Sequence, residues 1–134
     1  MKAEKDAPVM VDTSVWVEFF NRPGNKIAHH VKILLERDKV CLAGVVLTEI
    51  LQGVKGPEER KTLTETLSIL PFIETDREDW IAAGWRLNEL RAQGVTVPVT
   101  DAILAQLCLR YGIEIFTLDK HFDHFHDLRR YKPA

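Results

Sequence analysis

The sequence contains little cysteine and no long apolar run, and both absences limit what the protein can be. Only two of its 134 residues are cysteines, Cys41 and Cys108. Each lies within an apolar run, so we expect buried free thiols rather than a disulfide or a redox pair. No apolar stretch reaches the roughly 20 residues that a membrane-spanning helix needs. No apolar signal core follows Met1, so we expect a cytoplasmic protein without membrane contact.

The sequence also lacks a strong net charge, and it shows no linker, repeat or low-complexity segment. The 18 basic and 20 acidic side chains leave a formal net charge of −2, so a nucleic-acid partner would have to meet a local basic patch. Hydrophobic residues make up 46% and charged residues 28%, which is ordinary for a globular protein. The chain is long enough to bury one core, and we expect a single domain over residues 1–134.

Short apolar runs alternate with stretches of helical periodicity. The predicted strands cover residues 8–12, 40–43, 72–74 and 113–118, with a short edge strand at 127–131. The predicted helices cover residues 14–20, 26–37, 45–54, 57–70, 75–93 and 100–111. Strands that alternate with helices need crossover connections, which favour a mostly parallel sheet with helices on both faces. The expected fold class is therefore α/β, a three-layer α/β/α sandwich with four or five strands.

Local signals refine three of these helices. Thr75 and Glu78 have the spacing of a capping box, and Thr100 is expected to cap the helix that follows it. The helix over 45–54 is apolar on most sides, so we expect it to be well buried.

Four acidic residues stand out because each lies where a strand ends, or where a helix begins or runs through apolar surroundings. They are Asp12, Glu49, Asp101 and Asp119. Charge in such places is costly unless a cation meets it. Asp12 and Asp119 both follow strands, and ligands of parallel sheets bind beyond the carboxyl ends of strands, where strand order reverses. If the four acids converge, they form an oxygen-lined pocket for a divalent ion.

Each of these acids also has an ordinary structural role open to it. Asp12 can cap a helix, Asp101 suits the positive end of a helix dipole, and Asp119 can begin a turn. Glu49 has no lysine or arginine three or four residues away, and its ordinary role is an exposed helix edge. Thr117 shares a strand face with Asp119, so its hydroxyl can orient the site or simply belong to the strand.

Four segments carry these acids in order: residues 9–16 (VMVDTSVW), 47–53 (LTEILQG), 97–105 (VPVTDAILA) and 117–122 (TLDKHF). Together they resemble a PIN domain and, more closely, the VapC-type toxins of bacterial toxin–antitoxin pairs. The resemblance covers nearly the whole chain and implies a PIN-like fold. It also implies an endoribonuclease that depends on Mg²⁺, with Mn²⁺ as the alternative ion.

The resemblance assigns catalytic and metal-binding roles to Asp12, Glu49, Asp101 and Asp119. No acid of the family's set is missing, which argues against an inactive relative. The family's hydroxyl after the first acid falls on Thr13 or Ser14, and Ser14 is favoured as the supporting residue. Asp123 lies where some relatives hold a further acid, and its role stays open.

A hard divalent ion suits phosphodiester hydrolysis because it acidifies bound water and neutralises charge on the phosphate. Magnesium prefers oxygen ligands and keeps several waters, so a few carboxylates suffice. One-ion and two-ion arrangements are both compatible with four acids. Because the acids repel one another, we expect some metal sites to fill weakly until an RNA phosphate joins as a ligand.

The resemblance also implies partners: an RNA substrate, a VapB-like antitoxin and a second copy in a homodimer. Aromatic and aliphatic side chains of two helices either line an antitoxin groove or belong to the core: Trp16, Phe19, Phe20, Leu51 and Val54. Basic side chains either meet RNA or are ordinary solvated charges: Arg22, Lys26, Lys120, Arg129 and Arg130. The sequence names neither the RNA that is cut nor the surface of the dimer.

Other functions compete with the nuclease as explanations of these residues. Three histidines within residues 121–126 suggest a transition-metal site, but their spacing fits no closed zinc pattern. The alternative is a surface turn that Phe122 and Phe125 anchor in the core. A phosphatase of the haloacid dehalogenase type needs a second Asp where Ser14 stands, and a receiver domain needs an early acidic pair that is absent. A flap-type DNA nuclease needs helical arches for which the chain has no room. A catalytically inactive PIN-like module that binds RNA or protein stays open.

Overall fold

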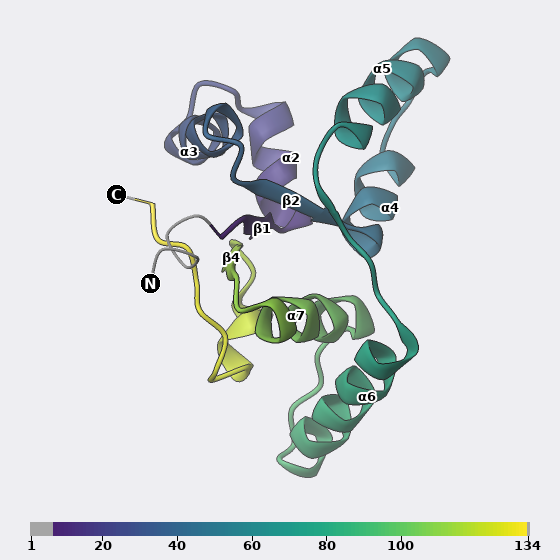
Figure 1. The fold of residues 1–134 in the computed structure, drawn as a ribbon, viewed down its shortest axis with the longest axis vertical. Coiled ribbons are helices and arrows are strands. Elements are labelled where there is room, and N and C mark those ends of the chain that lie inside the picture. The colour runs from purple at the N-terminus through teal and green to yellow at the C-terminus, as the bar shows by residue number, and fades with distance from the viewer. Residues whose placement is uncertain (1–6, 134) are drawn as a thin grey trace.

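Four short strands form one parallel sheet at the centre of the computed structural model, which describes residues 7–133 (Figure 1). The strands are β1 (Val9–Val11), β2 (Val40–Ala43), β3 (Phe72–Ile73) and β4 (Glu114–Phe116). Their order is β3-β2-β1-β4, and every neighbouring pair is parallel. The chain therefore moves outward from β1 to β3 and then returns to the other side of β1. The order reverses between β1 and β4, which is where parallel sheets bind ligands.

Helices make the crossovers between the strands. They are α2 (Thr13–Asn21), α3 (Lys26–Glu36), α4 (Gly44–Gln52), α5 (Pro57–Ser68), α6 (Arg77–Ala92) and α7 (Val99–Tyr111), with a 3₁₀ helix η1 (Lys120–His124) after β4. Because crossovers are right-handed, a reversal of direction in the sheet moves the following helices to the opposite face. Figure 1 shows α6 and α7 on the opposite side of the sheet from α2 and α3. The predicted α/β fold class is confirmed.

The strands are buried on both faces, as the apolar sequence runs predicted. All three residues of β1 and all four of β2 are buried. Val15 and Trp16 of α2 cover one face of the sheet together with Val31 and Leu34 of α3. Helix α7 covers the other face with its buried residues Ala102, Ile103, Leu104, Ala105, Leu107 and Cys108. Within the described residues, no helix is long and apolar enough to cross a membrane.

The two cysteines are free and buried, as predicted. Burial raises the pKa of the Cys41 thiol to about 12 and raises the pKa of the Cys108 thiol well above its ordinary value. Neither thiolate therefore forms near neutral pH, so both cysteines act as small apolar side chains of the core.

The predicted helix starts were wrong for two helices. The capping box belongs to Asp76 and Asp79, one residue beyond the predicted pair Thr75 and Glu78. Asp79 also forms an ion pair with Arg110 of α7. This tertiary contact determines that Asp79, rather than Glu78, points into the protein. Helix α7 begins at Val99 behind Pro98, so Thr100 lies inside the helix rather than capping it.

Two further expectations also need correction. Helix α4 buries only Val46 and Ile50, because, besides its contacts with α2, α5 and β2, several of its residues line two open cavities. Residues 127–131 form no named strand. A single parallel bridge joins Arg130 to Ile115, since the segment leaves the sheet edge after one pairing.

A buried ion pair joins α6 to α7. Asp79 is 1% exposed, and its carboxylate accepts hydrogen bonds from Arg110 at 2.6 Å and Gln106 at 3.3 Å. Burial alone would raise the pKa of this carboxyl, but the Asp76 backbone N–H, Gln106 and Arg110 together lower it. The ionised carboxylate of Asp79 is therefore more stable in the folded protein than in the unfolded chain.

Asp79→Ala should lower the free energy of unfolding by about 2 kcal/mol, since it removes a helix cap and a buried charged hydrogen bond. Because the folded pKa is depressed, this stabilisation is present above the unfolded pKa near 4 and is lost as pH falls through the folded value. Urea unfolding of both proteins between about pH 7 and pH 3 measures the difference. The control Glu78→Gln, at the exposed neighbouring acid, should stay within about 0.5 kcal/mol of wild type; an equal loss in that control would contradict this role for Asp79.

Candidate metal centre

Asp12 lies at the carboxyl end of β1 and is only 6% exposed. It occupies the N-cap position of α2, yet its side chain makes no capping hydrogen bond, so the ordinary role considered for it is wrong. Instead its Oδ2 accepts hydrogen bonds from the Ser14 hydroxyl at 2.8 Å and the Thr117 hydroxyl at 2.8 Å. Neutral hydroxyls orient the carboxylate without cancelling its charge, which leaves it available to a cation.

The same two hydroxyls tie the loop after β4 to the end of β1. Ser14 Oγ accepts a hydrogen bond from the backbone N–H of Leu118 at 3.1 Å, and Thr117 Oγ1 accepts one from Asp119 at 3.0 Å. Strand β4 ends at Phe116, so a shared strand face does not explain why Thr117 and Asp119 lie together. The hydrogen bond between them does. The hydroxyls of Ser14 and Thr117 thus orient the carboxylate of Asp12, and Thr117 also holds the backbone of Asp119.

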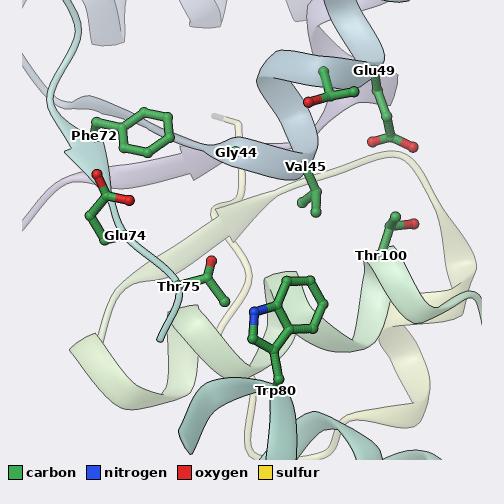
Figure 2. A pocket seen from close by; sticks show the side chains of 9 residues that line it. Gly44, Val45, Glu49, Phe72, Glu74, Thr75, Trp80 and Thr100 are labelled. Carbon is green, nitrogen blue, oxygen red and sulfur yellow. The ribbon is translucent and has the colours of Figure 1, made fainter. Parts of the chain in front are cut away.

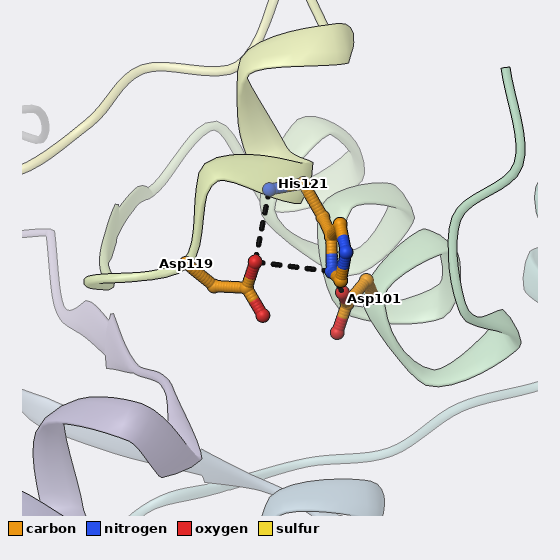
Figure 3. Close-up of side chains that lie close together, drawn as sticks. All are labelled: Asp101, Asp119 and His121. Carbon is orange, nitrogen blue, oxygen red and sulfur yellow. Dashed lines mark hydrogen bonds and ion pairs between the residues drawn. The ribbon is translucent and has the colours of Figure 1, made fainter.

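Asp101 and Asp119 converge on the side chain of His121 (Figure 3). Asp101 lies in the first turn of α7 and Asp119 caps η1, where its Oδ1 accepts the backbone N–H of His121 at 2.9 Å. The imidazole Nδ1 of His121 lies 2.8 Å from Asp101 Oδ2 and 3.0 Å from Asp119 Oδ1. Ligand atoms of the three residues all lie within 4.8 Å of one another.

The charges of these side chains act on one another. Burial raises the pKa of the Asp101 carboxyl, and the charges of Asp119 and Asp12 raise it further against the opposing hydrogen bond of His121. The hydrogen bond to Asp101 raises the pKa of the His121 imidazole, and the charge of Asp119 adds to this effect against some loss of solvation. The site therefore carries a negative potential that favours bound positive charge.

Glu49 reaches the margin of this group from α4. The Thr13 hydroxyl donates a hydrogen bond to Glu49 Oε1 at 2.7 Å, and Thr13 directly follows Asp12 in the chain. Glu49 is half-buried, and it is not one of the three residues whose ligand atoms gather within 4.8 Å. The structure therefore brings Asp101 and Asp119 together directly, connects Asp12 to Asp119 through Thr117, and attaches Glu49 to the same region through Thr13.

A cavity of about 380 Å³ opens beside Glu49 (Figure 2). It extends to Thr100, the neighbour of Asp101, and two of its walls are the aromatic side chains of Phe72 and Trp80. These rings are 43% and 47% exposed. The remaining lining residues are Gly44, Val45, Thr48, Glu74 and Thr75. Of the four acids, Glu49 alone lines this pocket, in which Phe72 and Trp80 offer flat apolar surfaces.

A second, larger cavity of about 700 Å³ lies between α2, α4 and α5. Phe20 and Val54 line it, as predicted for a groove, together with Val17, Ile50 and Leu63. Trp16 does not line it, since this side chain is 2% exposed and belongs to the core. Three acids, Glu49, Glu58 and Glu59, also face the groove. The groove is therefore apolar along its floor and negatively charged.

The histidine-rich segment is anchored by its aromatic residues. Phe122 and Phe125 are buried at 1% and 5% exposure, which confirms the surface-turn alternative. Among residues 7–133, His121 groups with the two acids, and the three histidines form no such group. Asp123 makes an ion pair with Arg130, so its carboxylate is already engaged.

The basic residues considered for RNA have different surroundings. Arg22 lies 3.7 Å from Glu18, and Arg129 donates to the carbonyl of Gly112. Lys26 begins α3 and Lys120 begins η1, both exposed. Lys120 is the nearest of them in sequence to the acids, because it lies between Asp119 and His121.

Sequence reasoning missed two residues of the site. From the sequence, Thr13 is only the alternative to Ser14. In the structure the Thr13 hydroxyl donates to Glu49, and the Ser14 hydroxyl donates to Asp12. His121 was considered only with the other histidines. Its position two residues after Asp119 was the available signal, because such spacing allows the backbone and side chain of one residue to turn toward the same carboxylate.

Comparisons with known proteins agree with this geometry. Residues 9–128 match the family described as PIN domain. Ribonuclease VapC11 of Mycobacterium tuberculosis and VapC ribonuclease Mb1587 of Mycobacterium bovis are each 31% identical over 119 residues, which is 86% of this chain and 89% of each relative.

Solved structures share the fold at lower identity. The DNA-bound VapBC structure from Salmonella typhimurium superposes with a TM-score of 0.77 at 22% identity, covering 96% of this chain and 99% of that one. VapBC2 from Rickettsia felis, bound to a promoter DNA fragment, gives a TM-score of 0.76 at 20% identity, covering 92% and 96%. With the family match and the curated relatives, this places the chain in the PIN domain family, among the VapC ribonucleases.

Proposed function

We propose that this protein is a metal-dependent endoribonuclease that acts as the toxin of a type II toxin–antitoxin pair. The proposal also takes residues 1–134 as one PIN domain and the cytoplasm as its compartment. One observation carries it: Asp12, Asp101 and Asp119, far apart in sequence, gather at the point where the order of the parallel sheet reverses. The relationship to proteins named VapC ribonucleases supports RNA as the substrate class.

The residues present fit a hard divalent ion such as Mg²⁺ or Mn²⁺. Asp12 is buried, and the hydrogen bonds that it accepts come from the neutral hydroxyls of Ser14 and Thr117. The charges of Asp119 and Asp12 both raise the pKa of the Asp101 carboxyl, so these acids repel one another. Carboxylate oxygens are the ligands that these ions prefer. We therefore propose Asp12, Asp101 and Asp119 as metal ligands, with Glu49 acting at the margin.

The bound ion would supply charge neutralisation at the phosphate and a more acidic water. The chain's own residues supply position. The hydroxyls of Ser14 and Thr117 fix the direction of the Asp12 carboxylate, and Thr13 fixes Glu49 at the edge of the aromatic pocket. Glu49 thus stands between the acids and the pocket, where its carboxylate can accept a proton from an attacking water or bind the ion through a water.

The pocket beside Glu49 supports single-stranded RNA as the bound form. Bases stack on exposed aromatic rings whatever their sequence, and each stacked base contributes about 1–3 kcal/mol. Phe72 and Trp80 offer such rings in the pocket that Glu49 also lines. A nucleotide that stacks there would bring RNA beside Glu49.

An inactive PIN-like binding module is the alternative function. It is disfavoured because all four acids are present and their supporting hydroxyls are hydrogen-bonded in place. Cleavage of RNA that requires added Mg²⁺ or Mn²⁺ and stops with EDTA separates the two functions.

Asp12→Asn should reduce RNA cleavage by at least about 1,000-fold, because the neutral amide removes the most buried anion of the site. The fold should persist, since Asn keeps an oxygen that accepts from Ser14 and Thr117. Initial rates on single-stranded RNA with Mg²⁺, together with far-UV circular dichroism, measure both effects. An undiminished rate in a folded variant would end the carboxylate-site proposal.

Trp80→Ala should raise KM for single-stranded RNA about tenfold through the loss of one stacked base, with kcat changed less than about twofold. The control is Tyr111→Ala, since Tyr111 is 46% exposed at the opposite end of α7 from Asp101. Steady-state cleavage of a fluorescent oligoribonucleotide measures both constants. Equal KM values in wild type and Trp80→Ala would exclude the stacking role.

The groove between α2, α4 and α5 supports a VapB-like antitoxin as partner, since solved neighbours are VapBC complexes. Its apolar floor suits an amphipathic helix, and Glu49, Glu58 and Glu59 suit a basic segment that leads toward the acids. A homodimer is also proposed. Ile81 and Trp85 of α6, 48% and 63% exposed, offer an apolar surface for the second copy.

Phe20→Arg should weaken antitoxin binding at least about tenfold, because it places a charge on the apolar floor of the groove. RNA cleavage by the isolated protein should be unchanged. The control Ile69→Arg alters an apolar side chain that is 81% exposed at the end of α5 and outside the groove. Calorimetric titration with the cognate VapB-like antitoxin measures affinity. If the two variants bind equally well, the antitoxin lies elsewhere.

A further inference from the structure

We propose that His121 is a further protein ligand of the metal ion, beside the carboxylates, and makes the site prefer Mn²⁺ over Mg²⁺. This inference rests on the proposed function, because it concerns the same ion. The observation behind it is a separate one, namely the position of an imidazole nitrogen beside two of the acids.

The position of the imidazole is the first argument. Nδ1 of His121 lies 2.8 Å from Asp101 Oδ2 and 3.0 Å from Asp119 Oδ1 (Figure 3). With metal–ligand bonds of about 2.1 Å at right angles, adjacent ligand atoms of an octahedral ion are roughly 3 Å apart. The nitrogen therefore already lies at the separation of a neighbouring ligand from each of the two oxygens, and ligand atoms of the three residues lie within 4.8 Å of one another.

The backbone holds the imidazole in that place. The N–H of His121 donates to Asp119 Oδ1 at 2.9 Å, and this bond forms the cap of η1. The next residue, Phe122, is buried at 1% exposure and anchors the turn in the core. The position of the His121 backbone is therefore set by the fold, and the contacts with Asp101 and Asp119 hold the direction of its side chain.

The chemistry of nitrogen gives the preference between ions. Magnesium binds carboxylates and waters and seldom takes imidazole, whereas first-row transition metals accept it. Mn²⁺ shares the carboxylate preference of Mg²⁺, but as a softer first-row transition ion it accepts an imidazole nitrogen more readily than Mg²⁺ does. A site of two carboxylates with one imidazole, and with Asp12 beside it, should therefore select Mn²⁺.

The test uses the full chain with millimolar Mn²⁺ and pulsed electron paramagnetic resonance, which detects a nitrogen nucleus bound directly to the ion. We expect a ¹⁴N coupling in wild type that is lost in His121→Ala and His121→Asn and kept in His124→Ala. His124 is a matched control, because it is also exposed on η1 and lies outside the group. His121 is exposed, so both variants should fold, as circular dichroism will check.

Calorimetric titration supplies the second measurement. His121→Ala should weaken Mn²⁺ binding about tenfold and Mg²⁺ binding less than about twofold. Bound Mn²⁺ without nitrogen coupling in wild type, or coupling that survives in His121→Ala, overturns the inference and leaves the proposed nuclease intact. No bound Mn²⁺ at millimolar concentration overturns both.

Discussion

Repulsion among carboxylates at the reversal point of the sheet is the constraint on which this site depends. Ligand atoms of Asp101 and Asp119 lie within 4.8 Å. At that separation two negative charges repel by on the order of 3 kcal/mol at an effective dielectric constant near 20, before water screens them. The His121 imidazole, whose Nδ1 contacts both carboxylates, offsets part of this cost, and the hydroxyls of Ser14 and Thr117 orient the neighbouring Asp12. Carboxylates this close together are stabilised when a bound cation neutralises part of their charge.

The topology explains why these residues meet. Asp12 follows β1 and Asp119 follows β4, and these two strands are neighbours although more than 100 residues separate them in sequence. Asp101 comes from the first turn of α7, and its carboxylate meets that of Asp119 at the side chain of His121. The acids are thus placed by the parallel register of the core, so the apolar residues that set the register also set the site.

Much of this could be predicted from sequence, and the failures have physical causes. Apolar runs located the strands because a parallel sheet is buried on both faces. The acids could be found because charges next to such runs are unusual. The capping box was displaced by one residue, since the choice of Asp79 depends on Arg110 of another helix. The partial exposure of α4 and the role of His121 depend on tertiary neighbours, which a periodic pattern does not contain.

The central claim is that these carboxylates hold a divalent cation, and anomalous X-ray diffraction from crystals soaked in Mn²⁺ tests it most directly. The account predicts an anomalous peak among the carboxylate oxygens of Asp12, Asp101 and Asp119. A crystal that is fully soaked and shows no peak there, or shows manganese only at other surfaces, would contradict it.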